Sequence, residues 1–283
     1  MARTPAWMLL MSVPLLPAHA AQAPSAQLLV DQEAKFQQAV VEQGTRAGFL
    51  SVLAESAIAM TPAPVPARAF YEGQAASESR LRWRPELAAI AAGGDFGWTS
   101  GPWVLFKSAR GAVPDASGAY LSVWRRRGAS WELWLDGGIA YGLSSAARAQ
   151  HLDVKARLRP VATQRATDQD CEQPFVALWK SKGRGPALRE YAADDLRLLQ
   201  SGQPPLDGRA AVAAGDALKN SRLEALHPAR RASSAAGDLE VTYGQYQIAP
   251  EADRARRALV YVEVWDKAKR CRLALEFTAP ITQ

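Results

Sequence analysis

The chain has 283 residues, of which 48% are hydrophobic and 22% are charged. This composition is typical of a soluble globular protein with room for one large domain or two of ordinary size. The net charge is +6, but no basic stripe is interleaved with aromatic residues, which disfavours nucleic-acid binding. The glycine motifs that bind phosphates or dinucleotides are missing from the sequence, so we predict no cofactor.

The first twenty residues are typical of an export signal rather than of a folded element. Arg3 precedes an apolar run at residues 6–16, and Ala18 and Ala20 match the pattern of a signal-peptidase site. We predict a signal peptide at residues 1–20, cleaved after Ala20, and a periplasmic or secreted mature protein. A membrane anchor is the alternative, but the run is shorter than the roughly 20 apolar residues that span a bilayer. No later segment reaches that length, so no membrane association is expected after cleavage.

Helices are predicted at the start of the mature chain, over residues 27–57. Leu50, Leu53 and Ala57 fall on one helical face at spacings i, i+3 and i+7. The proline-rich stretch at residues 61–66 stops the helix. After a short helical piece, alternating runs rich in Trp, Tyr and Val predict antiparallel strands, the last two of which form a hairpin.

The same order of patterns occurs a second time in the chain. Residues 92–103 resemble residues 235–246 at an offset of 143, and residues 119–125 match residues 260–266 at an offset of 141. A second helix is predicted from Pro186, a residue that suits the first helical turn. The apolar face of that helix has Leu188, Tyr191, Ala192, Leu196 and Leu199. These matches indicate an internal duplication.

Helices followed by antiparallel strands in both halves predict an α+β fold. We expect two tandem units, each a curved and mostly antiparallel sheet packed against about three helices. The first unit is placed at residues 25–142 and the second at residues 171–281. The stretch at residues 143–170 is polar and has no strong period, so it is assigned to the linker.

A family resemblance follows from the strand motifs. Residues 94–103 read G-D-x-G-x-T-x-G-x-W, residues 118–126 read G-x-Y-x-x-x-W-R-R, and Trp131 and Asp136 follow. This order resembles the SnoaL-like or DUF4440 type of the NTF2-like superfamily. The resemblance implies a cone-shaped domain with a pocket at its open end. Its relatives include ketosteroid-isomerase-like isomerases, polyketide cyclases, dehydratases and members without known activity, and a shared fold does not carry function with it.

Asp136 is the candidate acid or base in the first unit. The family that this sequence resembles includes enzymes that move protons. These place a carboxyl group in the pocket, where burial raises its pKa toward neutrality. Asp136 lies two residues after Trp134, so both side chains are expected on one strand face. The alternative is a turn at Asp136-Gly137-Gly138, since Asp before Gly favours turns. In the second unit an ungapped match places Phe277 opposite Asp136, so no base is expected there.

Aromatic residues are the other candidate ligand contacts. Most of them are expected to pack in the core, while those on the concave sheet face could line an apolar pocket for a small ligand. The candidates are Trp83, Trp98, Trp103, Tyr120, Trp124, Trp134, Tyr191, Tyr243 and Tyr261.

Cys171 and Cys271 are the two cysteines of the chain. They could form a disulfide in an oxidising compartment, or they could be two separate buried thiols. No CxxC or Cys/His ligand spacing is present, so no metal site is predicted.

Two functions remain open at this point. The first is an exported protein that binds a small apolar ligand or a protein partner without catalysis. The alternative is an isomerase, cyclase or dehydratase with a pocket carboxylate in the first unit. The resemblance implies that single domains of this family pair through their sheets. Two tandem copies could make that pair within one chain, so a monomer is expected.

Overall fold

The computed structural model describes residues 24–61, 63–75, 77–108, 110–161, 166, 168–249, 255–268 and 270–281. The predicted signal peptide, residues 1–20, lies outside the described residues. Within the described part of the chain, none of the helices combines the length and the apolar character needed to cross a membrane.

The first unit begins with two helices and continues into a sheet. Its elements are α1 (Gln27–Gln43), α2 (Thr45–Val52), β1 (Leu53–Met60), β2 (Pro64–Pro66), α3 (Ala67–Glu72), β3 (Arg80–Trp83), β4 (Leu87–Ile90), β5 (Phe96–Phe106), β6 (Ala116–Arg127) and β7 (Ser130–Ala140). The connecting segment has α4 (Ser145–Ala149) and β8 (Arg157–Leu158). The strand order is β2-β1-β7-β6-β5-β4-β8, and β3 also pairs with β5.

The second unit repeats this arrangement with fewer strands. Its elements are α5 (Glu172–Lys182), α6 (Arg184–Tyr191), β9 (Ala192–Gln200), β10 (Leu206–Asp207), α7 (Gly208–Gly215), β11 (Leu223–Ser233), β12 (Leu239–Ile248), β13 (Arg257–Asp266) and β14 (Arg272–Pro280). Its strand order is β10-β9-β14-β13-β12-β11. The path β10-β9-β14-β13-β12 follows the same connections as β2-β1-β7-β6-β5, so the prediction of two tandem α+β units is confirmed.

The helix predicted over residues 27–57 is wrong at its C-terminal end. Residues 53–60 form strand β1, which pairs in parallel with β7. The second unit shows the same difference, because α6 ends at Tyr191 and residues 192–200 form β9 beside β14. Pairing along a buried strand outweighs the helical preference of residues such as Ala, Leu and Glu.

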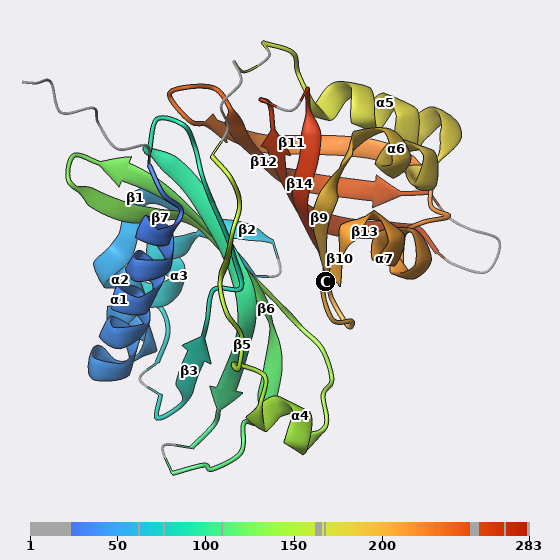
Figure 1. Cartoon of the computed structure of the whole chain (residues 1–283). Coiled ribbons are helices and arrows are strands. Elements are labelled where there is room, and N and C mark those ends of the chain that lie inside the picture. The colour runs from blue at the N-terminus through green and yellow to red at the C-terminus, as the bar shows by residue number, and fades with distance from the viewer. Residues whose placement is uncertain are drawn as a thin grey trace, which may run out of the picture.

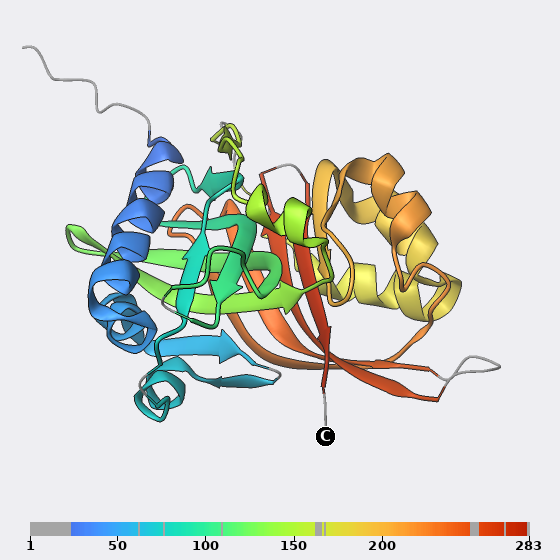
Figure 2. The same ribbon diagram turned by 90° about the horizontal axis from the view of Figure 1, so that it is seen from below.

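The two sheets pack face to face, and their own helices cover the opposite faces (Figure 1, Figure 2). One hydrophobic core therefore contains side chains from both units, including Trp98 and Leu135 of the first and Val241, Val260 and Phe277 of the second. Each unit has a further core between its sheet and its helices. This packing is the within-chain pairing of sheets that the repeat suggested.

A β-bulge in β7 changes the direction of one predicted side chain. Val123 pairs with Leu135 and Trp124 with Leu133, so Trp134 is an extra residue between them. Trp134 consequently lies in the core between the sheets, 6.0 Å from Tyr243 between ring centroids. The expectation that Trp134 and Asp136 share a strand face is therefore wrong, because the bulge breaks the alternation between them.

Candidate functional site

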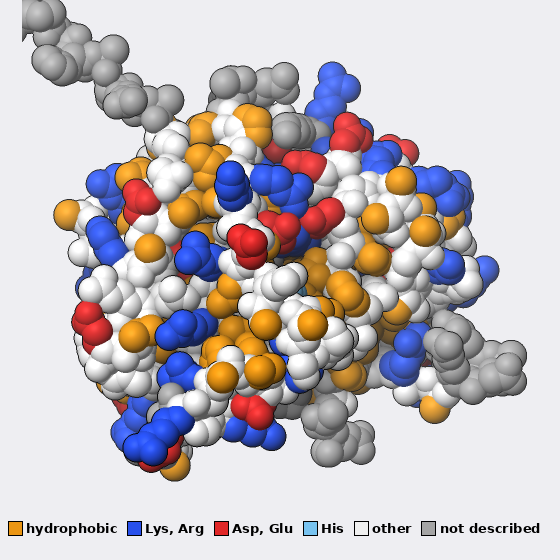
Figure 3. All heavy atoms as spheres, turned by 60° about the horizontal axis from the view of Figure 1, so that its bottom comes forward, with side chains coloured by type: hydrophobic (Ala, Val, Ile, Leu, Met, Phe, Trp, Pro, Cys, Tyr) orange, Lys and Arg blue, Asp and Glu red, His pale blue; other side chains and the backbone are white. Residues whose placement is uncertain are grey.

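A cavity of about 500 Å³ lies in the first unit, between the helices and the sheet face that they cover. Its wall is mostly aromatic and aliphatic. It is lined by Phe36, Phe49, Met60, Thr61, Tyr71, Leu81, Trp83, Trp103, Leu105, Tyr120, Ser122, Asp136, Gly137, Gly138, Ala140, Ser201, Ala279 and Pro280. Apolar side chains also gather along the seam between the two units on the face shown in Figure 3. A cavity of this size and lining suits a small apolar molecule.

Asp136 borders this cavity from within β7. The strand continues to Ala140, so Asp136 does not lie in a turn. It pairs across the sheet with Ser122, whose hydroxyl is 3.5 Å from Asp136 Oδ1, a long hydrogen bond. Burial, followed by the negative charge of Glu33, raises the pKa of Asp136 to about 7, while hydrogen bonds from Ser122 and Tyr71 oppose this rise. The carboxyl group therefore changes its protonation state near neutral pH.

Two tyrosines form part of the same cavity wall. Tyr71 stacks on Phe49 with ring centroids 4.2 Å apart, and its hydroxyl lies close to the carboxyl group of Asp136. The buried Tyr120 hydroxyl lies near Thr99 without hydrogen-bond geometry and has no partner among the described residues. Burial and the nearby Glu33 raise the pKa of Tyr120 well above its ordinary value, so it remains a hydrogen-bond donor. The ring of Tyr120 thus forms part of the cavity wall, while its hydroxyl is buried behind that wall.

Glu33 lies behind the cavity wall, on the buried face of α1. Trp83 Nε1 donates to it at 2.6 Å and Trp124 Nε1 at 3.0 Å, and the Thr99 hydroxyl donates as well. Burial raises the pKa of Glu33, and these hydrogen bonds counteract the rise. Glu33 was not among the predicted site residues. The available signal was one carboxylate on the otherwise apolar stripe Leu29, Phe36 and Val40.

Trp103 is held flat against the sheet to form part of the wall. Its Nε1 lies 3.1 Å from the carbonyl oxygens of both Ala119 and Ile139. This position requires Gly118, since a Cβ there would lie 2.4 Å from the Trp103 ring. The glycine of the G-x-Y motif thus makes room for an aromatic side chain of the cavity.

The predicted aromatic residues fall into three places. Trp83, Trp103 and Tyr120 line the cavity. Trp98, Trp134 and Tyr243 lie in the core between the sheets. Trp124 packs behind Glu33 in the helix-facing core of the first unit, while Tyr191 and Tyr261 pack in the corresponding core of the second. Alternation along a strand could not separate the two faces, because both are buried.

The second unit has a carboxylate at the position of Asp136, which corrects the sequence match with Phe277. Trp124 pairs with Leu133, and its counterpart Trp265 pairs with Leu273. The hairpin is thus one residue shorter in the second unit, and Glu276 takes the place of Asp136. Phe277 lies in the core between the sheets.

Glu276 is buried and bound to an arginine. Arg184 Nη1 donates to Glu276 Oε1 at 3.0 Å, and Arg184 Nε donates to Asp216 Oδ2 at 2.7 Å. Arg184 is the first residue of α6, directly after Gly183, as Thr45 is the first residue of α2 after Gly44. An arginine at this helix start therefore forms ion pairs with two buried carboxylates of the second unit, Glu276 and Asp216.

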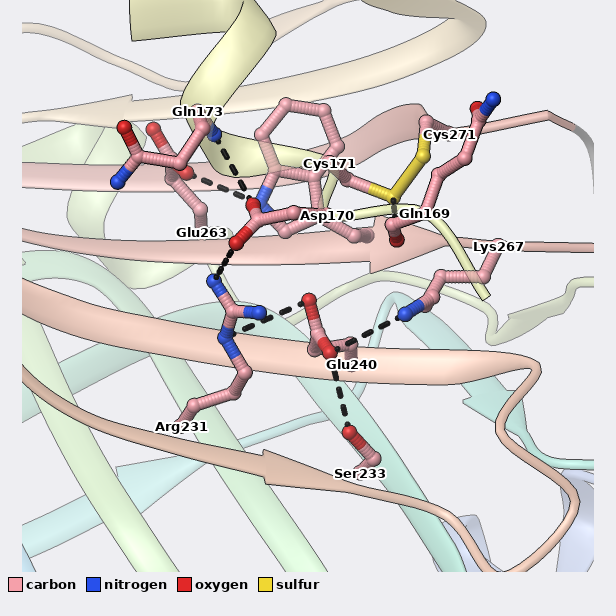
Figure 4. Close-up of a disulfide and its surroundings, with 11 residues drawn as sticks. Gln169, Asp170, Cys171, Gln173, Arg231, Ser233, Glu240, Glu263, Lys267 and Cys271 are labelled. Carbon is pink, nitrogen blue, oxygen red and sulfur yellow. Dashed lines mark hydrogen bonds and ion pairs between the residues drawn. A yellow bond between two sulfur atoms is a disulfide. The ribbon is translucent and has the colours of Figure 1, made fainter. Parts of the chain in front are cut away.

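Cys171 and Cys271 form a disulfide in the second unit, with their Cα atoms 5.2 Å apart. It joins the start of α5 to the β13–β14 hairpin (Figure 4). Ion pairs lie beside it, including Arg231 with Asp170 at 2.9 Å. Among the described residues, no three or more His, Cys, Asp or Glu side chains are grouped so that they could hold a metal ion.

Neither a family model nor a curated protein matches the sequence. Solved structures are similar to part of the chain. An NTF2-like protein from Cytophaga hutchinsonii is 16% identical and covers 40% of this chain and 93% of its own, with a TM-score of 0.32. An NTF2-like protein with a cystatin-like fold from Novosphingobium aromaticivorans is 19% identical and covers 44% and 86%, with a TM-score of 0.33. A candidate SnoaL-like polyketide cyclase from Mesorhizobium loti is 17% identical and covers 38% and 93%, with a TM-score of 0.28.

Proposed function

We propose that the first unit binds a small, largely apolar molecule with an oxygen function, and that Asp136 exchanges a proton with it. The observation that carries this proposal is the position of Asp136, which borders a mostly apolar cavity. The activity would be that of an isomerase, cyclase or dehydratase that uses a pocket carboxyl group.

The pKa of Asp136 suits such a reaction. A general base works best when its pKa lies near the working pH, and the pKa of Asp136 is about 7. As a carboxylate, Asp136 would take a proton from a ligand carbon next to a carbonyl group, and as a carboxylic acid it would return that proton to another position. Tyr71 and Ser122 would hold the carboxylate in place.

Ligand binding without proton transfer is the second candidate. It is favoured by the hydroxyl groups of Ser122 and Tyr71 beside Asp136, because these stabilise the carboxylate without a ligand. The second unit would support either function structurally, since its carboxylate Glu276 is paired with Arg184.

Export and a monomeric state are also part of the proposal. A disulfide is expected in an oxidising compartment, so the Cys171–Cys271 bond supports the periplasmic or secreted location. The packing of both sheets within one chain supports a monomer, because it occupies the face through which single units would pair. Sedimentation tests the monomer, and a stable dimer would contradict it.

Binding and proton transfer can be tested separately. The change in naphthol fluorescence on addition of the protein reports binding to the cavity. Incorporation of deuterium from heavy water next to the carbonyl of tetralone reports proton transfer. The unmodified protein should accelerate this exchange and Asp136→Asn should not, while Asp153→Asn, which removes an exposed carboxylate, should behave like the unmodified protein. If the Asp136→Asn variant exchanged deuterium as fast as the unmodified protein, proton transfer by Asp136 would be ruled out and ligand binding would remain as the function.

A further inference from the structure

The cavity of the first unit is not enclosed by the first unit alone. Ser201, Ala279 and Pro280 belong to the second unit and line the same cavity. Ser201 directly follows β9, while Ala279 and Pro280 are the last two residues of β14. Two neighbouring strands of the second sheet therefore end at the cavity.

Backbone contacts fix this part of the wall. The N–H of Gly202 donates to the carbonyl of Ala140 at 2.9 Å, and the N–H of Ser201 donates to that of Thr278 at 3.2 Å. The first of these bonds joins the two units at the end of β7. The Phe277 ring lies 3.4 Å from where a Cβ on Gly137 would be, so the units are also in close contact next to Asp136.

Exposure distinguishes an inner end of the cavity from an outer rim. The aromatic residues Phe36, Phe49, Trp83 and Tyr120 are buried and form the inner end. Gly138 and Ala140 of the first unit and Ser201 and Pro280 of the second are exposed, and Ala279 is half-buried. A ligand that packs one end against the buried aromatic rings would therefore point its other end toward the second unit.

We propose that the second unit sets the length of the ligand by forming the outer wall of the binding site. This inference rests on the proposed function and names the ligand class more closely. The ligand is an elongated, largely apolar molecule that carries its oxygen function beside Asp136 and packs its outer end on Ala279 and Pro280. The second unit thus acts in specificity although its own Glu276 is paired with Arg184.

Two probes of different length test the proposal in the full chain. Naphthol occupies the inner end, and hexylnaphthol extends the same ring system toward the rim. Ala279→Trp and Ser201→Trp should each weaken the binding of hexylnaphthol at least about tenfold, and that of naphthol less than about twofold. Ala177→Trp, on the exposed face of α5, is the matched control and should change neither.

The outcomes separate this inference from the proposed function. Unchanged affinity for hexylnaphthol in both rim variants overturns the inference, while naphthol binding to the unmodified protein leaves the proposed function standing. Equal loss of both probes also overturns it, since the rim would then not discriminate length. Ser201 is exposed and lies in a turn, so Ser201→Trp is the variant expected to keep its melting temperature. If the unmodified protein binds neither probe, the proposed function fails and the inference fails with it.

Discussion

Asp136 and Glu276 occupy the same position in the two units, each one residue beyond the second leucine of an L-x-L sequence on the final strand. Asp136 faces Ser122 across the sheet, and Glu276 faces Glu263. The neighbouring groups differ accordingly. Asp136 borders a cavity, while Glu276 is bound by Arg184. One position thus holds a carboxyl group poised near neutral pH in one unit and an ion-paired carboxylate in the other.

Asp136→Asn should change how stability depends on pH. Burial raises the pKa of Asp136 from 3.8 to about 7, so its contribution to stability is fully present at low pH and is lost as pH rises through about 7. Asparagine stays neutral throughout. The free energy of unfolding of the variant should therefore increase relative to the unmodified protein between about pH 4 and 7. Urea denaturation across this range measures the difference.

Asp207→Asn is the control with the opposite sign. Although burial opposes it, hydrogen bonds and the charge of Arg197 hold the pKa of Asp207 below its ordinary value. Its stabilising effect is thus present at neutral pH and is lost as pH falls. Asp207→Asn should be less stable than the unmodified protein at pH 7, and the gap should close in acid. If the stability difference from the unmodified protein changed with pH in the same direction for both variants, the opposite pKa shifts of Asp136 and Asp207 would be contradicted.

Glu33→Gln should lower the pKa of Asp136. After burial, the charge of Glu33 is the main factor that raises this pKa. Removing it should move the midpoint of the pH profile of naphthol binding to lower pH. The converging donors Trp83, Trp124 and Thr99 would lose a carboxylate acceptor, which should cost about 1–3 kcal/mol of stability.

The matched control for this variant is Glu42→Gln, an exposed change on the same helix. It should leave the midpoint and the stability as they are. A folded Glu33→Gln protein with an unshifted midpoint would show that the two carboxyl groups are not coupled.

Arg184→Thr gives the second unit the residue that the first unit has at this helix start. It removes the buried partner of both Glu276 and Asp216, and breaking a buried pair from one side costs about 3–5 kcal/mol. Urea denaturation should show this loss. Arg256→Ala breaks the exposed pair with Glu224 and should cost about 0–1 kcal/mol. A similar cost for both variants would mean that burial of the Arg184 network does not matter.

Reduction of the disulfide should destabilise the protein. The bond joins residues 100 positions apart, and a loop of that size corresponds to about 4–5 kcal/mol in the chain-entropy model. The unfolding midpoint in urea should therefore fall when a thiol reductant is added. Because the chain has two cysteines, the double variant Cys171→Ser and Cys271→Ser should have the lower midpoint and no response to reductant.

The order of helices and strands could be predicted from the sequence because the same order of patterns occurs in both units. The boundary between α2 and β1 could not, since Leu53 and Ala57 suit a helical face equally well. Only the parallel pairing with β7, far along the chain, makes residues 53–60 a strand. Non-local pairing of this kind leaves little trace in local spacing.

The candidate site could be predicted only in part. Asp136 could be found because the family resemblance predicts a pocket carboxyl group, and Asp136 lies near the end of the last strand of the unit. Its counterpart was missed because the second hairpin is one residue shorter, which shifts the alignment of the final strands by one residue. Matching the two L-x-L sequences, Leu133 to Leu135 and Leu273 to Leu275, would have aligned Asp136 with Glu276.

Because both sheets belong to one polypeptide, the two units that pack together need not be identical. In a homodimer each substitution appears on both sides of the interface, so an arginine that fills one binding site fills the other as well. Here Arg184 occupies the core of the second half while Thr45 stands at the same place in the first. The covalent link also keeps the two halves together at any dilution. Each half can therefore change its buried residues without changing those of the other.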